Sequence, residues 1–136
     1  MGEQVYTLKL KRDMPIFLEL AETAGHRADK VAELCMNDEN GIVDPQNLQC
    51  TSAGKLTATV PTPIAFARKP YLFLYSKIYP QQNTPETYRV ECSFQAPGEF
   101  TLHDAHDKEI PSKKIILSEK FTDYTRISLR INIILV

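Results

Sequence analysis

Apolar and polar residues alternate along most of this chain, and a period of two residues is typical of β-strands. In the segment 124–135, for example, apolar side chains occupy every second position from Ile127 to Ile133. Glycine and proline turn signals separate such segments from one another. The pattern predicts strands over residues 4–11, 15–20, 55–60, 71–79, 87–95, 99–103, 113–118 and 124–135, with a shorter one over 64–66.

One segment departs from this alternation. Within residues 27–35, four small or apolar residues recur at helical spacing, namely Ala28, Val31, Ala32 and Cys35. This spacing predicts one short helix near 27–35. A strand over 31–36 is the alternative, and it would lead into Asn40-Gly41, a dipeptide favoured in tight hairpin turns because both residues accept positive φ angles.

Seven to nine short strands with frequent turn signals predict an all-β fold. We expect a two-sheet antiparallel β-sandwich of immunoglobulin-like (Ig-like) architecture, and a closed β-barrel is the alternative. The Cys…Trp…Cys core signature of antibody domains is excluded, because the chain has no tryptophan. A length of 136 residues fits a single domain over 1–136.

Charge and composition exclude several classes of protein. Lys and Arg number 16 against 17 Asp and Glu, a balance that argues against a nucleic-acid binder, which must neutralise phosphates. No apolar run approaches the ~20 residues of a transmembrane helix. The sequence also lacks a Gly-x-Ser-x-Gly elbow and a Walker A loop, so we expect no catalytic residues and no cofactor.

The pairing state of the three cysteines would indicate the cellular compartment of the protein. Cys92 lies on the apolar side of its predicted strand, which indicates a buried thiol. Cys35 and Cys50 bracket a loop with turn signals and are candidates for a disulfide bridge. Such a bridge would indicate an oxidising compartment, and we therefore favour a periplasmic or extracellular protein whose leader has been removed. Three free thiols would instead indicate the cytosol.

Two loops carry residue types that bind metals. Two of the three histidines fall in one loop, where His103, His106 and Asp107 are candidate ligands for zinc or nickel. Such a site needs further ligands from elsewhere, and a solvated turn is the competing interpretation. The oxygen-rich segment 37–44 is a candidate calcium site, but Met36 and Asn47 stand at the end positions where an EF-hand needs Asp and Glu.

The most informative segment for function is 68–79. Its leucines and isoleucine share one face of a strand, and its aromatic residues share the other. If the leucine face is buried, the aromatic row offers large contact area at low rotamer cost, together with hydroxyl groups. The competing interpretation is a central strand covered on both faces. The candidate partner-binding residues are Arg68, Lys69, Tyr71, Phe73, Tyr75 and Tyr79.

The two terminal segments suggest a different mode of binding. The apolar row of 124–135 is long, and a long apolar edge strand tends to pair with another chain. If this strand or the strand over 4–11 lies at a sheet edge, it could join a partner by β-augmentation. Ordinary pairing within the domain is the competing interpretation.

These observations predict a non-catalytic protein-binding or assembly module, of the kind found in secreted adhesion and structural proteins. The partner would be a protein, a second copy of the chain, or a carbohydrate stacked on the aromatic row. One alternative is a structural subunit of a surface fibre or shell. The other is a metal-dependent enzyme that uses the loop of His103 and His106.

Overall fold

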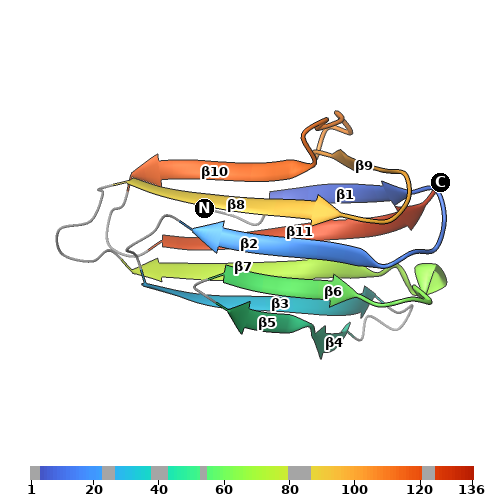
Figure 1. Cartoon of the computed structure of the whole chain (residues 1–136), viewed down its shortest axis with the longest axis horizontal. Coiled ribbons are helices and arrows are strands. Elements are labelled where there is room, and N and C mark those ends of the chain that lie inside the picture. The colour runs from blue at the N-terminus through green and yellow to red at the C-terminus, as the bar shows by residue number, and fades with distance from the viewer. Residues whose placement is uncertain (1–3, 23–26, 38–42, 53–54, 80–86, 121–124) are drawn as a thin grey trace.

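A computed structural model describes residues 4–22, 27–37, 43–52, 55–79, 87–120 and 125–136. Eleven strands and one short 3-10 helix make up this part of the chain (Figure 1). The elements are β1 (Gln4–Leu10), β2 (Ile16–Glu22), β3 (Arg27–Asn37), β4 (Val43–Asn47), β5 (Gln49–Ser52), β6 (Lys55–Val60), η1 (Phe66–Arg68), β7 (Tyr71–Tyr79), β8 (Thr87–Gln95), β9 (Phe100–His103), β10 (Lys114–Lys120) and β11 (Thr125–Leu135).

The strands form two sheets that pack face to face, which confirms the predicted β-sandwich (Figure 1). Sheet A has the order β4-β3-β7-β11-β1-β9, and sheet B has the order β10-β8-β2-β6-β5. Both sheets are open, with β4 and β9 as the edges of sheet A and β5 and β10 as the edges of sheet B. The β-barrel alternative is therefore wrong.

Alternation along each strand directs one set of side chains into the space between the sheets. Leu72 and Leu74 of β7 are at most 1% exposed, and Ile16, Leu56 and Leu102 are completely buried. Tyr88 and Cys92 of β8 fill the same core from sheet B. Because each buried apolar side chain contributes roughly 1.5–3 kcal/mol, this shared interior holds the two sheets together.

The terminal strands lie inside sheet A. β11 pairs antiparallel with β7 and parallel with β1, and β1 in turn pairs with β9. Neither strand is a sheet edge, because both have neighbours on either side. The condition for β-augmentation through these strands is therefore not met, and ordinary pairing within the domain, the competing interpretation, is confirmed. The parallel β1–β11 pair also departs from the purely antiparallel sandwich that we expected.

The predicted helix near 27–35 is also wrong, because these residues belong to the eleven-residue strand β3. Val31 and Cys35, which completed the helical spacing, occupy the outer side of the strand, opposite Tyr75 and Tyr71 of β7. The inner row instead includes Lys30, a charged residue that hides the two-residue period in the sequence. β3 and β4 pair antiparallel on either side of Asn40-Gly41, as the hairpin alternative predicted.

Lys30 is tolerated in the interior because Glu22 lies opposite it on sheet B. The Lys30 Nζ atom lies 2.7 Å from both carboxylate oxygens of Glu22, and the two side chains are 6% and 9% exposed. Ser76 is the direct neighbour of Lys30 on β7. Its hydroxyl is buried and has no hydrogen-bond partner in the part of the chain that the structure describes. This end of the sandwich interior is therefore polar.

Candidate functional site

The predicted aromatic row of β7 faces outward. Leu72, Leu74 and Ile78 point into the core, whereas the alternate side chains lie half-buried on the outer side of sheet A. The condition that we set for a binding surface, a buried leucine face with the aromatics outside, is thus met. We call this surface the aromatic face; it consists of Tyr71, Phe73, Tyr75, Lys77 and Tyr79.

Charged side chains flank the aromatic face on both sides. On β3, Asp29 is paired with Lys77 and Glu33 with Phe73. On β11, Arg126 is paired with Lys77 and Arg130 with Phe73. Two acidic residues therefore lie along one side of the aromatic face, and two basic residues lie along the other.

Contacts within the face hold its side chains in place. The rings of Phe73 and Tyr75 are stacked, with centroids 6.5 Å apart and an angle of 17° between their planes. The Arg130 guanidinium carbon lies 3.9 Å from the centroid of the Tyr71 ring, a cation–π contact. The Tyr79 hydroxyl donates a hydrogen bond of 3.1 Å to Asp29. Such contacts limit rotamer freedom, so less entropy is lost when a partner binds.

A hollow of about 560 Å³ adjoins the Tyr71 end of the face. Its lining includes Lys69 and several residues of β11 that were not among the predicted binding residues, Arg130, Asn132 and Ile134 among them. Arg130 donates from Nε to Asn132 Oδ1 over 3.1 Å, which fixes both side chains. The alternation of β11 indicated that these residues share a side. However, no feature of the sequence showed that β11 lies next to β7.

The two basic residues that precede β7, Arg68 and Lys69, have different surroundings. Arg68 ends η1 and is exposed. Lys69 adopts a left-handed conformation with φ of 52° and leads the chain from η1 into β7. Lys69 therefore lines the hollow beside the aromatic face, whereas Arg68 is not among the residues that line it.

The histidine loop forms a compact turn. Asp104 Oδ1 accepts hydrogen bonds from the backbone N–H groups of His106 and Lys108, each 2.9 Å long, and these bonds lower the pKa of Asp104. His103 contacts Thr101 Oγ1 at 2.8 Å. Asp107 forms an ion pair with Lys9, in which Lys9 Nζ lies 2.7 Å from Asp107 Oδ1, and this pair lowers the pKa of Asp107.

These contacts engage the candidate metal ligands His103 and Asp107 in the turn, and leave the side chain of His106 exposed. Over the described part of the chain, no three His, Cys, Asp or Glu side chains form a group that could hold a metal ion. The centre of the calcium candidate, residues 38–42, lies outside the described residues.

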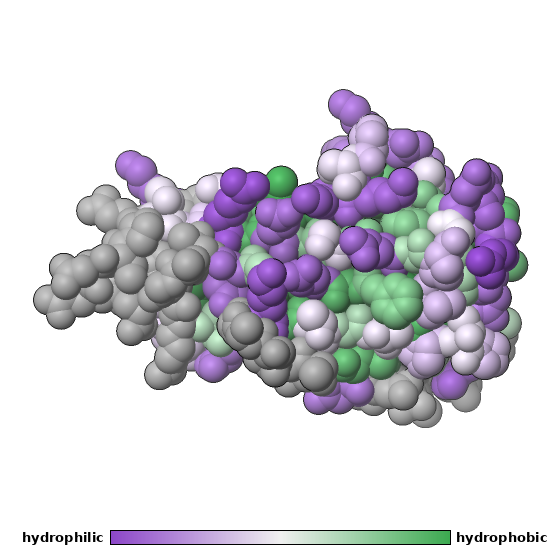
Figure 2. All heavy atoms as spheres, viewed as in Figure 1, coloured by the Kyte–Doolittle hydropathy of each residue, from purple (hydrophilic) through white to green (hydrophobic). Residues whose placement is uncertain are grey.

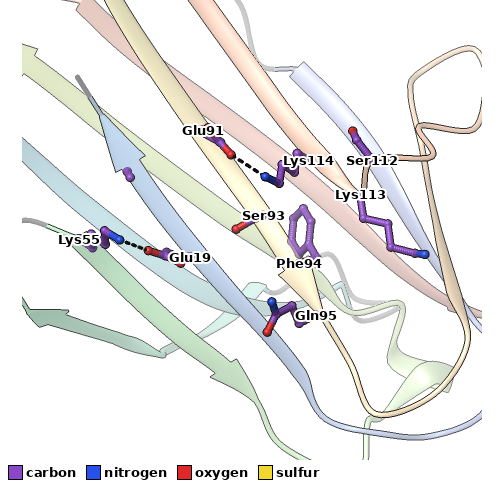
Figure 3. Close-up of a pocket in the computed structure, with 10 residues that line it drawn as sticks. Glu19, Lys55, Glu91, Ser93, Phe94, Gln95, Ser112, Lys113 and Lys114 are labelled. Carbon is purple, nitrogen blue, oxygen red and sulfur yellow. Dashed lines mark ion pairs between the residues drawn. The ribbon is translucent and has the colours of Figure 1, made fainter. Parts of the chain in front are cut away.

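The outer side of sheet B has a different character. Hydrophilic residues cover much of this side, with hydrophobic residues between them (Figure 2). A hollow of about 490 Å³ lies among Glu19, Lys55, Glu91 and Lys114, where Ser93 has a small side chain (Figure 3). Lys55 pairs with Glu19 at 2.9 Å and Lys114 pairs with Glu91 at 3.2 Å. These charges already neutralise one another, so the hollow is a weaker candidate than the aromatic face.

Two cysteines are buried as free thiols. Cys92 is completely buried, as predicted, and burial strongly raises its pKa. Cys35 of β3 lies beside Tyr71 of β7, and burial raises the pKa of the Cys35 thiol as well. Cys50 belongs to β5 in sheet B, but its side chain lies outside the described residues. Because Cys35 is a free thiol, the predicted Cys35–Cys50 bridge is not formed in this structure.

Comparison with known proteins adds no further constraint. No protein-family model matches the chain, and no curated protein is significantly similar to it. Among the described residues, no helix is long and apolar enough to cross a membrane.

Proposed function

We propose that the protein is a non-catalytic binding module that recognises a partner protein through the aromatic face of sheet A. The observation that carries this proposal is the outward position of Tyr71, Phe73, Tyr75 and Tyr79 on a strand whose other side fills the core. A carbohydrate that stacks on these rings is the second class of partner for the same surface.

The physical argument rests on what such a surface gains when it is covered. Tyrosine and phenylalanine present large apolar areas with few rotatable bonds, and the tyrosine hydroxyls remain available for hydrogen bonds. Interfaces owe most of their affinity to a few aromatic and arginine side chains near their centre. Tyr75 lies at the middle of the aromatic face, and Arg130 joins the face through Tyr71.

The test compares retention of a partner by immobilised variants exposed to an extract of the cells that naturally produce the protein. Tyr75→Ala should weaken retention by about tenfold or more, because it removes a central aromatic contact. Its melting temperature should fall by no more than about 5 °C, because Tyr75 lies on the outer side of sheet A and its loss opens no cavity in the core.

Two matched variants complete the test. Phe17→Ala removes an aromatic ring that is 45% exposed on the opposite side of the sandwich, and it should leave retention unchanged. Leu74→Ala removes a core side chain next to Tyr75 in sequence and should cost about 2–5 kcal/mol of stability. The proposal fails if Tyr75→Ala retains the partner as the wild type does, or if it destabilises the protein as much as Leu74→Ala.

A further inference from the structure

A threonine hydroxyl and an imidazole ring meet on β9, an edge strand of sheet A. Thr101 and His103 lie two residues apart on this strand, so their side chains share its outer side. Thr101 Oγ1 lies 2.8 Å from His103 Nε2, which is hydrogen-bond distance. The His103 side chain is 12% exposed, and Thr101 is partly buried. The contact is therefore shielded from most of the solvent without being enclosed.

The other ring nitrogen of His103 determines the direction of this hydrogen bond. His103 Nδ1 lies 3.3 Å from the backbone carbonyl oxygen of Asp107 and 3.5 Å from Asp107 Oδ1. Both of these oxygens are acceptors, so the proton of the neutral ring is on Nδ1. Nε2 then carries no proton, and it accepts the hydrogen bond that the Thr101 hydroxyl donates.

Lys9 keeps the Asp107 carboxylate beside the imidazole ring. Its Nζ atom lies 2.7 Å from Asp107 Oδ1, the same oxygen that faces His103 Nδ1. The Asp107 side chain is 72% exposed, so this ion pair limits its movement. Hydroxyl, imidazole and carboxylate thus follow one another in the order that activates a nucleophile, in which the imidazole takes the hydroxyl proton and the carboxylate orients the ring.

A hollow of about 450 Å³ adjoins the Thr101 hydroxyl-bearing residue. Ala96, Phe100 and Lys113 contribute to its lining, and its surface is mainly apolar. Lys113 Nζ lies 5.2 Å from the centroid of the Phe100 ring, a cation–π contact within this lining. Pockets that bind small molecules have the same character, with apolar walls and a few polar groups that fix orientation. A short apolar chain therefore fits this hollow.

We propose that Thr101 is an acyl-acceptor site, to which an ester or thioester with a short apolar acyl chain transfers its acyl group. Thr101 Oγ1 attacks the acyl carbon while His103 Nε2 takes the hydroxyl proton. A bond forms between Oγ1 and the acyl carbon, and the bond from this carbon to the leaving oxygen or sulfur breaks. His103 then returns the proton to the leaving group. The product is an ester on Thr101, and the reaction consumes no other reactant.

This inference goes beyond the proposed function and does not depend on it. In sheet A, β1 and β11 lie between β9 and β7, so the acceptor site is separate from the aromatic face. The transfer takes place once on each molecule and needs no turnover. A protein that binds its partner through β7 can therefore carry an acyl group on β9.

The test exposes the protein to p-nitrophenyl butyrate and locates butyryl groups by mass spectrometry of its peptides. Thr59 is the internal reference, because it is an exposed strand threonine whose cross-strand neighbour on β2 is Phe17. Thr101 should react about a hundredfold faster than Thr59, because a positioned general base contributes roughly 10²–10⁴-fold. His103→Gln should remove this advantage, because an amide can form hydrogen bonds but is no base. Thr101→Ser keeps the hydroxyl and should keep the advantage.

Release of p-nitrophenolate, measured in parallel, detects an ester that forms and is then hydrolysed, and Thr101→Val should lower this release. The proposal is overturned if Thr101 reacts no faster than Thr59 and Thr101→Val leaves the release unchanged. It is equally overturned if His103→Gln melts like the wild type and its Thr101 still reacts as fast. The comparison of Thr101 with Thr59 is made within one wild-type molecule, so it remains decisive even if a variant does not fold.

Discussion

Lys30 and Glu22 form an ion pair that joins the two sheets inside the sandwich. Removing two charges from water is costly, and their attraction offsets this cost only when the geometry is close. Here one ammonium group lies 2.7 Å from both oxygens of the carboxylate. This pair also explains why the sequence indicated a strand here only as the alternative to a helix, and only over 31–36. A lysine in the inner row breaks the apolar alternation, and only its partner on a distant strand makes that position acceptable.

Replacing one member of the pair should be far more damaging than replacing both. Lys30→Met leaves the Glu22 carboxylate buried without its cation, and we expect it to lower the free energy of unfolding by about 3–5 kcal/mol. The double variant Lys30→Met with Glu22→Met removes both charges and should recover most of this loss. Urea denaturation of the three proteins measures these differences.

The exposed pair of Lys55 and Glu19 provides the comparison, because solvent screens it. Lys55→Met should therefore change stability little. If Lys30→Met and the double variant lower the free energy of unfolding by the same amount, the buried charges are not coupled.

At the scale of elements, the strands with clean alternation were predicted well. The bounds of β6, β7 and β8 agree with the sequence prediction, and β11 differs by one residue at its start. The prediction missed β4, which contains Pro45, and β5, which has only four residues. Both are sheet-edge strands, where a proline or a short length is tolerated. The aromatic side of β7 was predicted, whereas its charged neighbours depend on strand order, which alternation within one segment does not encode.

β1 should be indispensable, because β11 pairs with every one of its residues and both Leu8 and Leu10 are completely buried. A variant that lacks residues 1–10 should lose its cooperative thermal transition in circular dichroism. The prediction is contradicted if the truncated chain melts at the same temperature as the full chain and has lost only the ability to bind a partner. It would revive the idea that this strand is donated to a partner.

At the scale of the whole molecule, the sandwich has two outer sides with different chemistry. The side formed by sheet B pairs its own charges, as Glu19 does with Lys55 and Glu91 does with Lys114. The side formed by sheet A presents a row of aromatic rings with acidic residues of β3 on one side and basic residues of β11 on the other. A surface whose charges are already paired gains little from a partner, whereas a row of partly exposed aromatic rings gains from being covered. This difference is why we place recognition on sheet A.

The most direct measurement of this claim is site-specific photo-crosslinking in the cells that naturally produce the protein. The photoreactive phenylalanine analogue p-benzoylphenylalanine would replace Tyr75 in one variant and Phe17 in the other, so that each variant exchanges one aromatic residue for another. Our account predicts a discrete covalent adduct from position 75 and none from position 17. Adducts from position 17 and none from position 75 would contradict the account.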